Sequence, residues 1–379
     1  MGSDDGLQPL SRSPVASILM VSKPVAPPWN DSSKNLVRDL CSSMERHVPI
    51  ALTTRSSSSS LGRAQLRRIY RDGVAGFSPG LASHGRVLAS LLLGRRVDGW
   101  HFFFAPNAKT STAGAVARRL RRVRTVQTVC SAPREPRKAI RWLFADCTVV
   151  LSRHTEERFI EAGLERSRLR RIAPCIEPLG PLNPAQRSAA RTRLGLPHDS
   201  CIVVYPGDLE FGGGAELVLA ALRVSKEPLH LVMACRRKTS AAAQVEQRLR
   251  ARADRLGSVS WMGETGEIHA LLACADVVAL PSTDLFAKMD YPLVVLEAMS
   301  LERPVVVARQ TAAAELSEAG GVLTVEPGAE ALAAMLDALS EDASRRAALG
   351  EKARAQVLRE HDRHGMARAY EALYDELLG

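Results

Sequence analysis

Residues 275–308, ADVVALPSTDLFAKMDYPLVVLEAMSLERPVVVA, decide the fold of this chain. They include two apolar runs, at residues 276–280 and 304–308, without polar alternation, which is typical of parallel strands buried on both faces. Between the runs lies Pro292, whose ring presets the backbone for a first helical turn and lacks an N–H that would be unpaired there, so a helix is expected at Leu293–Ser300. The stretch therefore predicts a strand, a loop, a short helix and a second strand.

Glu297 is the one acidic residue of this helix, and Val294, Val295, Leu296, Ala298 and Met299 flank it. A carboxylate in apolar surroundings is costly to desolvate unless other groups bind it. The two hydroxyls of a ribose would supply donors to the carboxylate, and the N–H groups at the start of the helix would suit a phosphate. The alternative is an ordinary solvent-facing or ion-paired glutamate.

The segment at residues 290–299, DYPLVVLEAM, with PVV at residues 304–306 after it, resembles the nucleotide-binding motif of the retaining glycosyltransferase family called GT4. The resemblance implies an α/β protein of the GT-B fold. In that fold two Rossmann-like domains with parallel sheets face each other across a cleft, and the C-terminal helix crosses back to the first domain. The resemblance also implies that Glu297 matches the second glutamate of the motif, which holds the ribose of the sugar donor.

The first glutamate of the family motif, which contacts the transferred sugar, would fall at Met289. Methionine accepts hydrogen bonds only weakly, so the adjacent Asp290 and Lys288 are candidates to take over this role. The donor-binding residues expected from the resemblance are Gly207, Gly213, Gly214, Asp290, Tyr291, Pro292, Leu293 and Glu297.

The three glycines belong to a turn at residues 206–215, PGDLEFGGGA, between a strand at 201–205 and a helix at 216–223. Glycines let the backbone approach a ligand closely and leave helix N–H groups free to bind an anion. The turn resembles the first turn of the nucleotide-binding domain in the family. Many relatives carry an arginine and a lysine there to hold the diphosphate, and this chain carries neither.

Arg236 and Lys238 follow the next expected strand, at residues 229–235. They would lie at the carboxyl edge of the sheet, where open α/β sheets bind ligands. With Glu297 they are the expected catalytic residues, and the positive charges of Arg236 and Lys238 would stabilise a departing diphosphate. The alternative for both is an ordinary basic turn between a strand and a helix.

Strand-like runs alternate with helical segments along the chain, which predicts right-handed crossovers and parallel sheets. The clearest helical periods are at Leu81–Leu93, Ala108–Arg121 and residues 345–378. The serine tract at residues 56–60 and the arginine-rich segment after it are expected to be a surface loop. No Walker lysine pattern or GxGxxG follows the first strand, so a site for ATP or a nicotinamide cofactor is not supported.

The length of 379 residues exceeds what one hydrophobic core usually supports, so two domains are expected. Prolines gather at residues 178–184, where we place the hinge. With the resemblance, this predicts a disordered leader at residues 1–14 and an acceptor-binding domain at 15–180. A nucleotide-sugar-binding domain at 181–355 and a returning helix at 356–379 complete the expected organisation.

The first domain should open with a strand at residues 16–22 and a loop that leads into a helix near Asp31, a junction where doubly wound folds take up ligands. Residues at this junction can equally be helix caps. A further candidate, His101, has a structural role as its alternative. The expected acceptor-side residues are Asn30, Ser32, Lys34, Asn107 and His154.

Charge is unevenly placed along the chain. Residues 1–180 hold 29 Lys and Arg against 14 Asp and Glu, a net charge of 29 − 14 = +15, and the remainder holds 22 − 27 = −5. We expect an anionic acceptor, including a lipid-linked one, and peripheral contact with an anionic membrane through the arginines at residues 63–71 and 118–124. The alternative is a solvated arginine-rich face. The basic half lacks the stacking aromatic pattern of a nucleic-acid binder.

These features predict a glycosyltransferase that moves a sugar from a UDP-, GDP- or other nucleotide diphosphate sugar to an acceptor, with retention and without a metal or cofactor. A non-catalytic sugar-nucleotide-binding protein or a GT-B sugar-nucleotide epimerase is the alternative, although the chain shows no acid–base set for epimerisation. No apolar run reaches membrane length, and the seven cysteines form no CxxC pair. We expect free thiols and a cytoplasmic protein, with the inner membrane face as a possible place of action.

Overall fold

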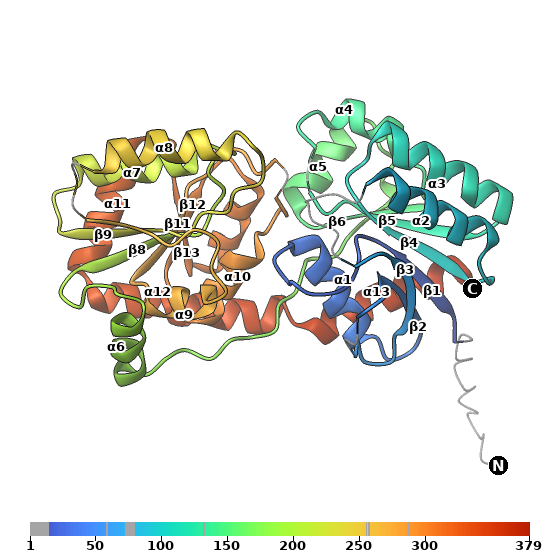
Figure 1. Ribbon diagram of the computed structural model, residues 1–379, viewed down its shortest axis with the longest axis horizontal. Helices are drawn as coiled ribbons and strands as arrows, with labels where there is room; N and C mark the ends of the chain where they lie inside the picture. Colours follow the sequence, from blue (N-terminus) through green and yellow to red (C-terminus); the bar gives the residue numbers. More distant parts are fainter. Residues whose placement is uncertain are drawn as a thin grey trace, which may run out of the picture.

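The computed structural model of the chain describes residues 15–57, 60–72, 80–131, 133–254, 256, 258–286 and 288–379. The leader expected at residues 1–14 lies outside the described residues. Two parallel β-sheets, each with helices on both sides, lie next to each other (Figure 1). The expected α/β architecture with two Rossmann-like domains is confirmed.

Within the described residues, the first sheet has the strand order β3-β2-β1-β4-β5-β6-β7, and all its pairs are parallel. Its strands are β1 (Ser17–Val21), β2 (Val48–Thr54), β3 (Gln65–Tyr70), β4 (Gly99–Phe103), β5 (Arg124–Thr128), β6 (Cys147–Val150) and β7 (Leu169–Arg171). The helices of this half are α1 (Ser32–Ser43), α2 (Leu81–Leu93), α3 (Ala108–Arg121), α4 (Pro136–Ala139) and α5 (Arg153–Glu161), with short 3₁₀ helices at Ile140–Trp142 and Arg166–Arg168.

Strand β1 shows why this sheet is covered on both faces. Successive side chains of a strand point to opposite faces. Ile18 and Met20 belong to the core on the side of α1, whereas Leu19 and Val21 pack in a second core with residues of α2 and α3. In register, Ile18 lies opposite Gly99 of β4, so β1 and β4 end at the same edge of the sheet.

Strand β3 corrects one sequence expectation. The arginine-rich segment after the serine tract was expected to be a surface loop, but Gln65–Tyr70 pairs in parallel with β2, with Ile50 opposite Gln65. Its side chains are mostly half-buried or exposed, and only Tyr70 is buried. An edge strand tolerates such charged residues, and its composition therefore looks like that of a loop. The short strand β7 was not foreseen either.

Within the described residues, the second sheet has the strand order β10-β9-β8-β11-β12-β13, again with parallel pairs. Its strands are β8 (Cys201–Tyr205), β9 (Leu229–Met233), β10 (Val259–Trp261), β11 (Val277–Leu280), β12 (Val305–Ala308) and β13 (Val322–Val325). Its helices are α6 (Pro184–Arg193), α7 (Gly214–Val224), α8 (Ala242–Ala253), α9 (Ile268–Cys274), α10 (Leu293–Ser300), α11 (Ala329–Glu341) and the 3₁₀ helix Ala312–Ala319. Helix α10 begins directly after Pro292, as expected.

The helical period at residues 345–378 is divided into α12 (Ala343–Glu360) and α13 (Arg363–Leu378). The break falls at Asp362, whose carboxylate accepts hydrogen bonds from the N–H groups of His364 and Gly365 and so caps α13. Helix α12 packs against α10 of the second sheet, whereas α13 packs against α1 of the first (Figure 1).

Glu371 ties α13 to the first sheet. Its Oε1 accepts hydrogen bonds from the backbone N–H groups of Glu45, Arg46 and His47, at 3.0, 2.6 and 3.1 Å, in the loop between α1 and β2. Only 1% of Glu371 is exposed. A buried carboxylate with three such donors holds the helix in place, because its loss would leave three backbone donors unpaired, of which that of His47 is buried.

We expect Glu371→Ala to lower the free energy of unfolding by about 3 kcal/mol, because it removes a buried, hydrogen-bonded charge. Urea unfolding followed by circular dichroism measures the change. The matched control is Glu376→Ala on the same helix, where an exposed carboxylate pairs with Arg170 and should contribute less than about 1 kcal/mol. Equal effects of the two substitutions would contradict the role given to Glu371.

Candidate functional site

A cleft of about 1370 Å³ lies between the two sheets. First-domain residues that follow β1, β4 and β5 line one side, and second-domain residues that follow β8 and β9 or begin α10 line the other. Both domains therefore present their carboxyl strand edges, where open α/β sheets bind ligands. The volume exceeds the roughly 300–1,000 Å³ of a typical small-molecule pocket, so the cleft has room for two ligands.

Glu297 of α10 lines this cleft, and so do Pro292 and Leu293 at the start of the same helix. The side chain of Glu297 is 20% exposed, and its Oε1 lies 3.4 Å from Nε2 of His269 on α9. The start of α10 thus brings N–H groups and the positive end of the helix dipole to the cleft, next to a carboxylate. This arrangement suits a ligand with an anionic group, which the helix start would bind, and two neighbouring hydroxyls, which the carboxylate would bind.

His269 was missed by the sequence reasoning. Its hydrogen bond with Glu297 raises the pKa of the imidazole, although partial burial opposes that shift. The sequence signal that could have found it is its place at the start of α9, directly after a turn with Gly263 and Gly266, both of which also line the cleft.

Asp290 and Tyr291 do not line the cleft, contrary to expectation. Asp290 is 1% exposed and accepts a 2.6 Å hydrogen bond from Ser152 of the first domain, and burial raises the pKa of its carboxyl. The Tyr291 hydroxyl donates to Glu315 at 2.5 Å. Asp290 thus joins the two domains, and of the two candidates to replace the first motif glutamate only Lys288 lines the cleft.

A cluster of three cations surrounds the buried Asp208 at the ends of β8 and β9. Its Oδ2 lies 2.8 Å from Nζ of both Lys238 and Lys288, and its Oδ1 lies 3.6 Å from Nε of Arg236. Burial by itself would raise the pKa of Asp208, but Lys288 and Lys238 hold it below its ordinary value. One carboxylate shared by three cations leaves the cluster positive, which suits an anionic ligand.

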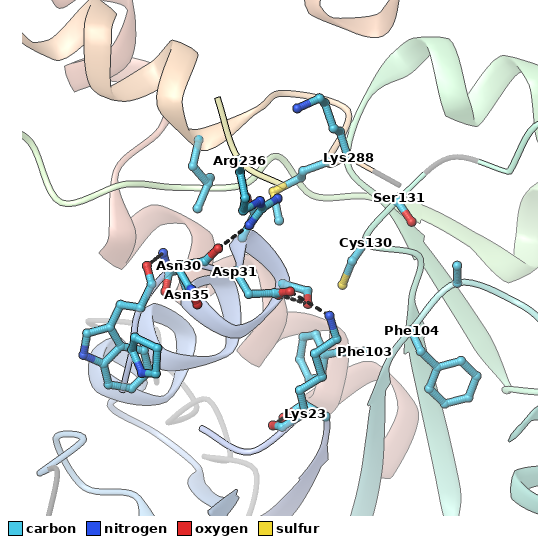
Figure 2. A pocket seen from close by; sticks show the side chains of 18 of the residues that line it. Lys23, Asn30, Asp31, Asn35, Phe103, Phe104, Cys130, Ser131, Arg236 and Lys288 are labelled. Atoms are coloured by element: carbon cyan, nitrogen blue, oxygen red, sulfur yellow. Dashed lines mark hydrogen bonds and ion pairs between the residues drawn. The ribbon is translucent and has the colours of Figure 1, made fainter. Parts of the chain in front are cut away.

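Only part of this cluster reaches the cleft. Arg236 and Lys288 line it, whereas Lys238, with a side chain 3% exposed, does not. Figure 2 shows Arg236 and Lys288 in the upper part of the view, with Ser131 and Cys130 below and to the right of Lys288. Lys238 was expected to face the ligand, but it does not line the cleft. Its amine instead pairs with the carboxylate of Asp208.

The glycine turn has two separate roles. Gly207 lines the cleft, and a Cβ there would lie 2.2 Å from the ring of Tyr205, so the close packing requires glycine. Gly213 has a φ of 65° and precedes α7, and a Cβ on Gly214 would lie 2.5 Å from Oγ of Ser282. Gly213 and Gly214 do not line the cleft, so they shape the turn rather than contact a ligand there.

On the first-domain side, Asn30, Ser32 and Asn107 line the cleft. Next to them lies an ion pair that sequence reasoning did not single out, with Nζ of Lys23 2.6 Å from Oδ2 of Asp31 (Figure 2). Burial raises the pKa of Asp31, but Lys23 and further hydrogen bonds bring it below its ordinary value. The pair places one charge of each sign beside the space where an acceptor would lie.

Lys34 and His154 do not line the cleft. Nζ of Lys34 donates to the carbonyl of Ala26 at 2.8 Å inside the domain, and burial lowers the pKa of the amine. The backbone N–H of His154 donates to Glu315 at an interdomain contact. The structure thus gives both residues positions in the scaffold.

His101 is structural. It is fully buried, with Nδ1 2.6 Å from the Tyr374 hydroxyl of α13 and Nε2 2.7 Å from Oγ1 of Thr128. Burial holds the pKa of the imidazole well below its ordinary value. His101 therefore helps to hold α13 on the sheet.

Three further features of the part of the chain that the structure describes concern metal ligands, membrane-spanning helices and cysteines. It contains no group of three or more His, Cys, Asp or Glu residues placed to hold a metal. None of its helices has the length and apolarity needed to cross a bilayer. The seven cysteines are free, and all but Cys201 are buried.

The fold and the cleft define a class. Two parallel-sheet domains whose carboxyl edges line one cleft, with a helix start, a carboxylate and a cation cluster on one side, are the architecture of a GT-B protein. This chain is similar to the structure of Anabaena HepE in complex with UDP and glucose, with a TM-score of 0.76 and 18% identity. The superposition covers 96% of this chain and 100% of the HepE chain. At that identity the likeness shows the fold.

The second domain carries the family signal. Residues 200–342 match the family described as glycosyl transferases group 1, which confirms the resemblance to GT4-like glycosyltransferases of the GT-B fold. A D-inositol 3-phosphate glycosyltransferase of Xylanimonas cellulosilytica is 30% identical over 224 residues, 56% of this chain and 52% of the relative. EpsD of Bacillus subtilis is 28% identical over 180 residues, 44% of each chain. The chain thus spans about half the length of these curated relatives.

We expect the His269 imidazole to titrate above the ordinary histidine pKa of about 6.5, because the Glu297 carboxylate favours its charged form. Glu297→Gln should bring that pKa to or below the ordinary value, since partial burial and the charge of Arg38, which both lower it, then remain. NMR titration of the histidine ring protons measures both values. His230, whose pKa burial lowers, is the internal control and should not change. An unchanged His269 pKa in Glu297→Gln would show that the two side chains do not interact.

Proposed function

We propose that this chain is a glycosyltransferase that moves a sugar from a nucleotide diphosphate sugar to an acceptor, with retention and without a metal. The observation that carries the proposal is the arrangement on the second-domain side of the cleft. There Glu297 and the start of α10 lie beside Arg236 and Lys288, as a ribose and a diphosphate require. The family match over residues 200–342 supports the same conclusion.

In this proposal the carboxylate of Glu297 accepts hydrogen bonds from the ribose hydroxyls. His269 keeps that carboxylate oriented from the side. Arg236 and Lys288 bind the diphosphate, and Lys238 acts through Asp208, which both lysines share. Lys288 lies next to Met289, the position of the motif's first glutamate, and its ammonium donates to a hydroxyl of the transferred sugar where the glutamate would accept.

The reaction needs little beyond positioning and charge. The acceptor oxygen forms a bond to the anomeric carbon, the bond from that carbon to the diphosphate oxygen breaks, and the hydroxyl proton leaves with the diphosphate. Negative charge grows on the departing diphosphate, and preorganised cations in a partly closed cleft stabilise it. Retention is proposed on the resemblance to GT4 and metal independence on the cation cluster, which supplies the charge that a metal would otherwise provide.

A UDP sugar is the first donor to test, because the Anabaena HepE structures hold UDP and glucose or UDP-glucose. The acceptor in this proposal is anionic, in keeping with the net charge of +15 over residues 1–180. Lipid linkage and peripheral action at the cytoplasmic membrane face are part of the proposal. Not all first-domain arginines serve it: Arg118 is paired with Asp146 and Arg121 donates to the carbonyls of Leu92 and Gly94, so both stabilise the fold.

The purified protein should be incubated with a panel of UDP, GDP, ADP and dTDP sugars, and mass spectrometry should follow the release of nucleoside diphosphate. A transferase releases it slowly to water from one donor, and the anomer formed reports retention. Chelator should not change the rate. Binding of a sugar nucleotide without any release would instead favour a sugar-nucleotide-binding protein, for which Met289 in place of the motif glutamate is the specific observation. Absence of binding to every member of the panel would reject the proposal.

Variants of the cleft separate the two halves of the donor site. Arg236→Gln and Lys288→Gln should each weaken UDP by about 30-fold, equivalent to about 2 kcal/mol for a charge-assisted hydrogen bond, and leave uridine unchanged. Glu297→Gln should weaken UDP and uridine by the same factor, because both carry the ribose. Calorimetry measures these affinities, with the preferred nucleotide in place of UDP if the panel selects another base.

The matched control is Arg237→Gln. Arg237 is adjacent in sequence, but its side chain pairs with Glu246, 2.7 Å away, and does not line the cleft. It should bind UDP and uridine like the unmodified protein. If Arg236→Gln and Arg237→Gln weaken UDP equally, the loss reflects general charge, and Arg236 has no place at the diphosphate.

A further inference from the structure

The first-domain end of the cleft is apolar. Beyond Asn30 and the Lys23–Asp31 pair, the cleft continues between the ends of β3 and β4 and the inner side of α2. Most of the described side chains that line this compartment are apolar, namely Tyr70, Val87, Leu88, Leu91, Phe102 and Phe104, and His84 of α2 and Thr110 of α3 are the polar neighbours that also line the cleft. Such a lining differs from that of the second-domain side, where Glu297, Arg236 and Lys288 meet.

The floor of the compartment belongs to the packed core of the first domain. Tyr70, Leu91 and Phe102 belong to one buried core and are 2%, 5% and 2% exposed. The Tyr70 hydroxyl donates to the carbonyl of Ser22 at 2.6 Å, so its polar end is satisfied within the protein. Helix α2 packs against β3 and α3, which leaves its inner face to roof the space above the ends of β1 and β4.

An apolar path leads from the compartment to the surface. Leu81, at the start of α2, lines the cleft and is 84% exposed. Leu88, Lys109 and Ala113 line both the cleft and a shallow groove between α2 and α3. Val116 in that groove is 52% exposed. The compartment thus opens toward solvent along side chains that are mainly apolar.

The chemistry of the lining selects its occupant. A saccharide would leave hydroxyl groups without partners against these side chains, and burying a polar group without a hydrogen bond is unfavourable. Nδ2 of Asn107, which lines the same cleft, already donates to the carbonyl of Ala105 and to Oγ1 of Thr110. A hydrocarbon chain has no polar group that would lose a hydrogen bond there. Each methylene that moves from water into the compartment multiplies the affinity by about fourfold.

We propose that the acceptor carries a hydrocarbon chain, that this chain lies in the compartment formed by α2, β3 and β4, and that the head group with its hydroxyl lies toward the donor. The inference rests on the proposed function for the reaction but names the substrate class by a separate observation. The exposed amine of Lys109 at the edge of the path and the basic first domain suit an anionic head group.

Alkyl phosphates of different length test the compartment directly. Calorimetry on the full chain, with UDP present and absent, should compare inorganic phosphate, butyl phosphate and octyl phosphate below its micelle concentration. Octyl phosphate should bind at least tenfold more tightly than butyl phosphate, because four further methylenes enter apolar surroundings. Equal binding of the two alkyl phosphates, or binding no better than that of inorganic phosphate, would overturn the proposal.

Two variants separate the compartment from general attraction. Leu88→Glu places a charge at its lining, and Ala113→Trp fills the space beside Leu88 without adding charge. Each should reduce octyl phosphate binding at least tenfold and leave UDP binding unchanged, which also shows that the protein is folded. Val224→Glu, at a 45% exposed apolar residue of α7 in the second domain, is the control and should change neither. If Val224→Glu reduces octyl phosphate binding as much as Leu88→Glu does, the chain binds elsewhere and the proposal is wrong.

Failure of the hydrocarbon site and failure of the proposed glycosyltransferase function give different results. If UDP and the sugar nucleotides fail to bind while octyl phosphate behaves as expected, the proposed function is rejected and the hydrocarbon site stands. If a donor is used and its sugar is transferred to methyl glucoside as fast as to octyl glucoside, the glycosyltransferase stands and the hydrocarbon acceptor is rejected.

Discussion

The return of the chain from the second sheet to the first is the constraint on which the rest of the structure depends. Helix α12 packs on α10, and α13 follows it after two intervening residues and is fixed to the first domain by the buried carboxylate of Glu371. Because consecutive helices belong to different domains, the carboxyl edges of both sheets are held facing one cleft. Together with the direct interdomain hydrogen bonds from Ser152 to Asp290 and from His154 to Glu315, this constraint fixes Glu297 relative to the Lys23–Asp31 pair.

Within the cleft, one buried carboxylate decides where the positive charge lies. Asp208 binds Lys238 from behind and Lys288 and Arg236 at the cleft, so three cations share one anion and the net charge is 3 − 1 = +2. Burial strengthens these interactions, since water does not screen them. Residues from three separate segments thereby supply the positive charge that relatives are expected to carry in the glycine turn. The first-domain wall of the cleft is instead mainly apolar, with aromatic and aliphatic side chains of the packed core.

The periodic parts of the structure could be predicted from sequence, and the directions of single side chains could not. Leu81–Leu93 and Ala108–Arg121 have the expected bounds because their apolar residues recur with the helical period. At the end of β9, however, Arg236 enters the cleft, Arg237 turns to Glu246 and Lys238 folds back on Asp208. Successive residues leave a strand end in different directions, so proximity in sequence did not identify which cation would face the ligand.

The sequence by itself determined the α/β class, the two domains and the motif that starts α10 after Pro292 and places Glu297 on it, because buried parallel strands and helix starts leave local patterns in composition. Only the tertiary structure decided that His269 meets Glu297, that Asp290 joins Ser152 instead of the cleft, and that α2 roofs an apolar compartment. These relations join segments far apart in the chain, and their energies depend on burial and distance. Neither quantity exists until the two sheets have packed.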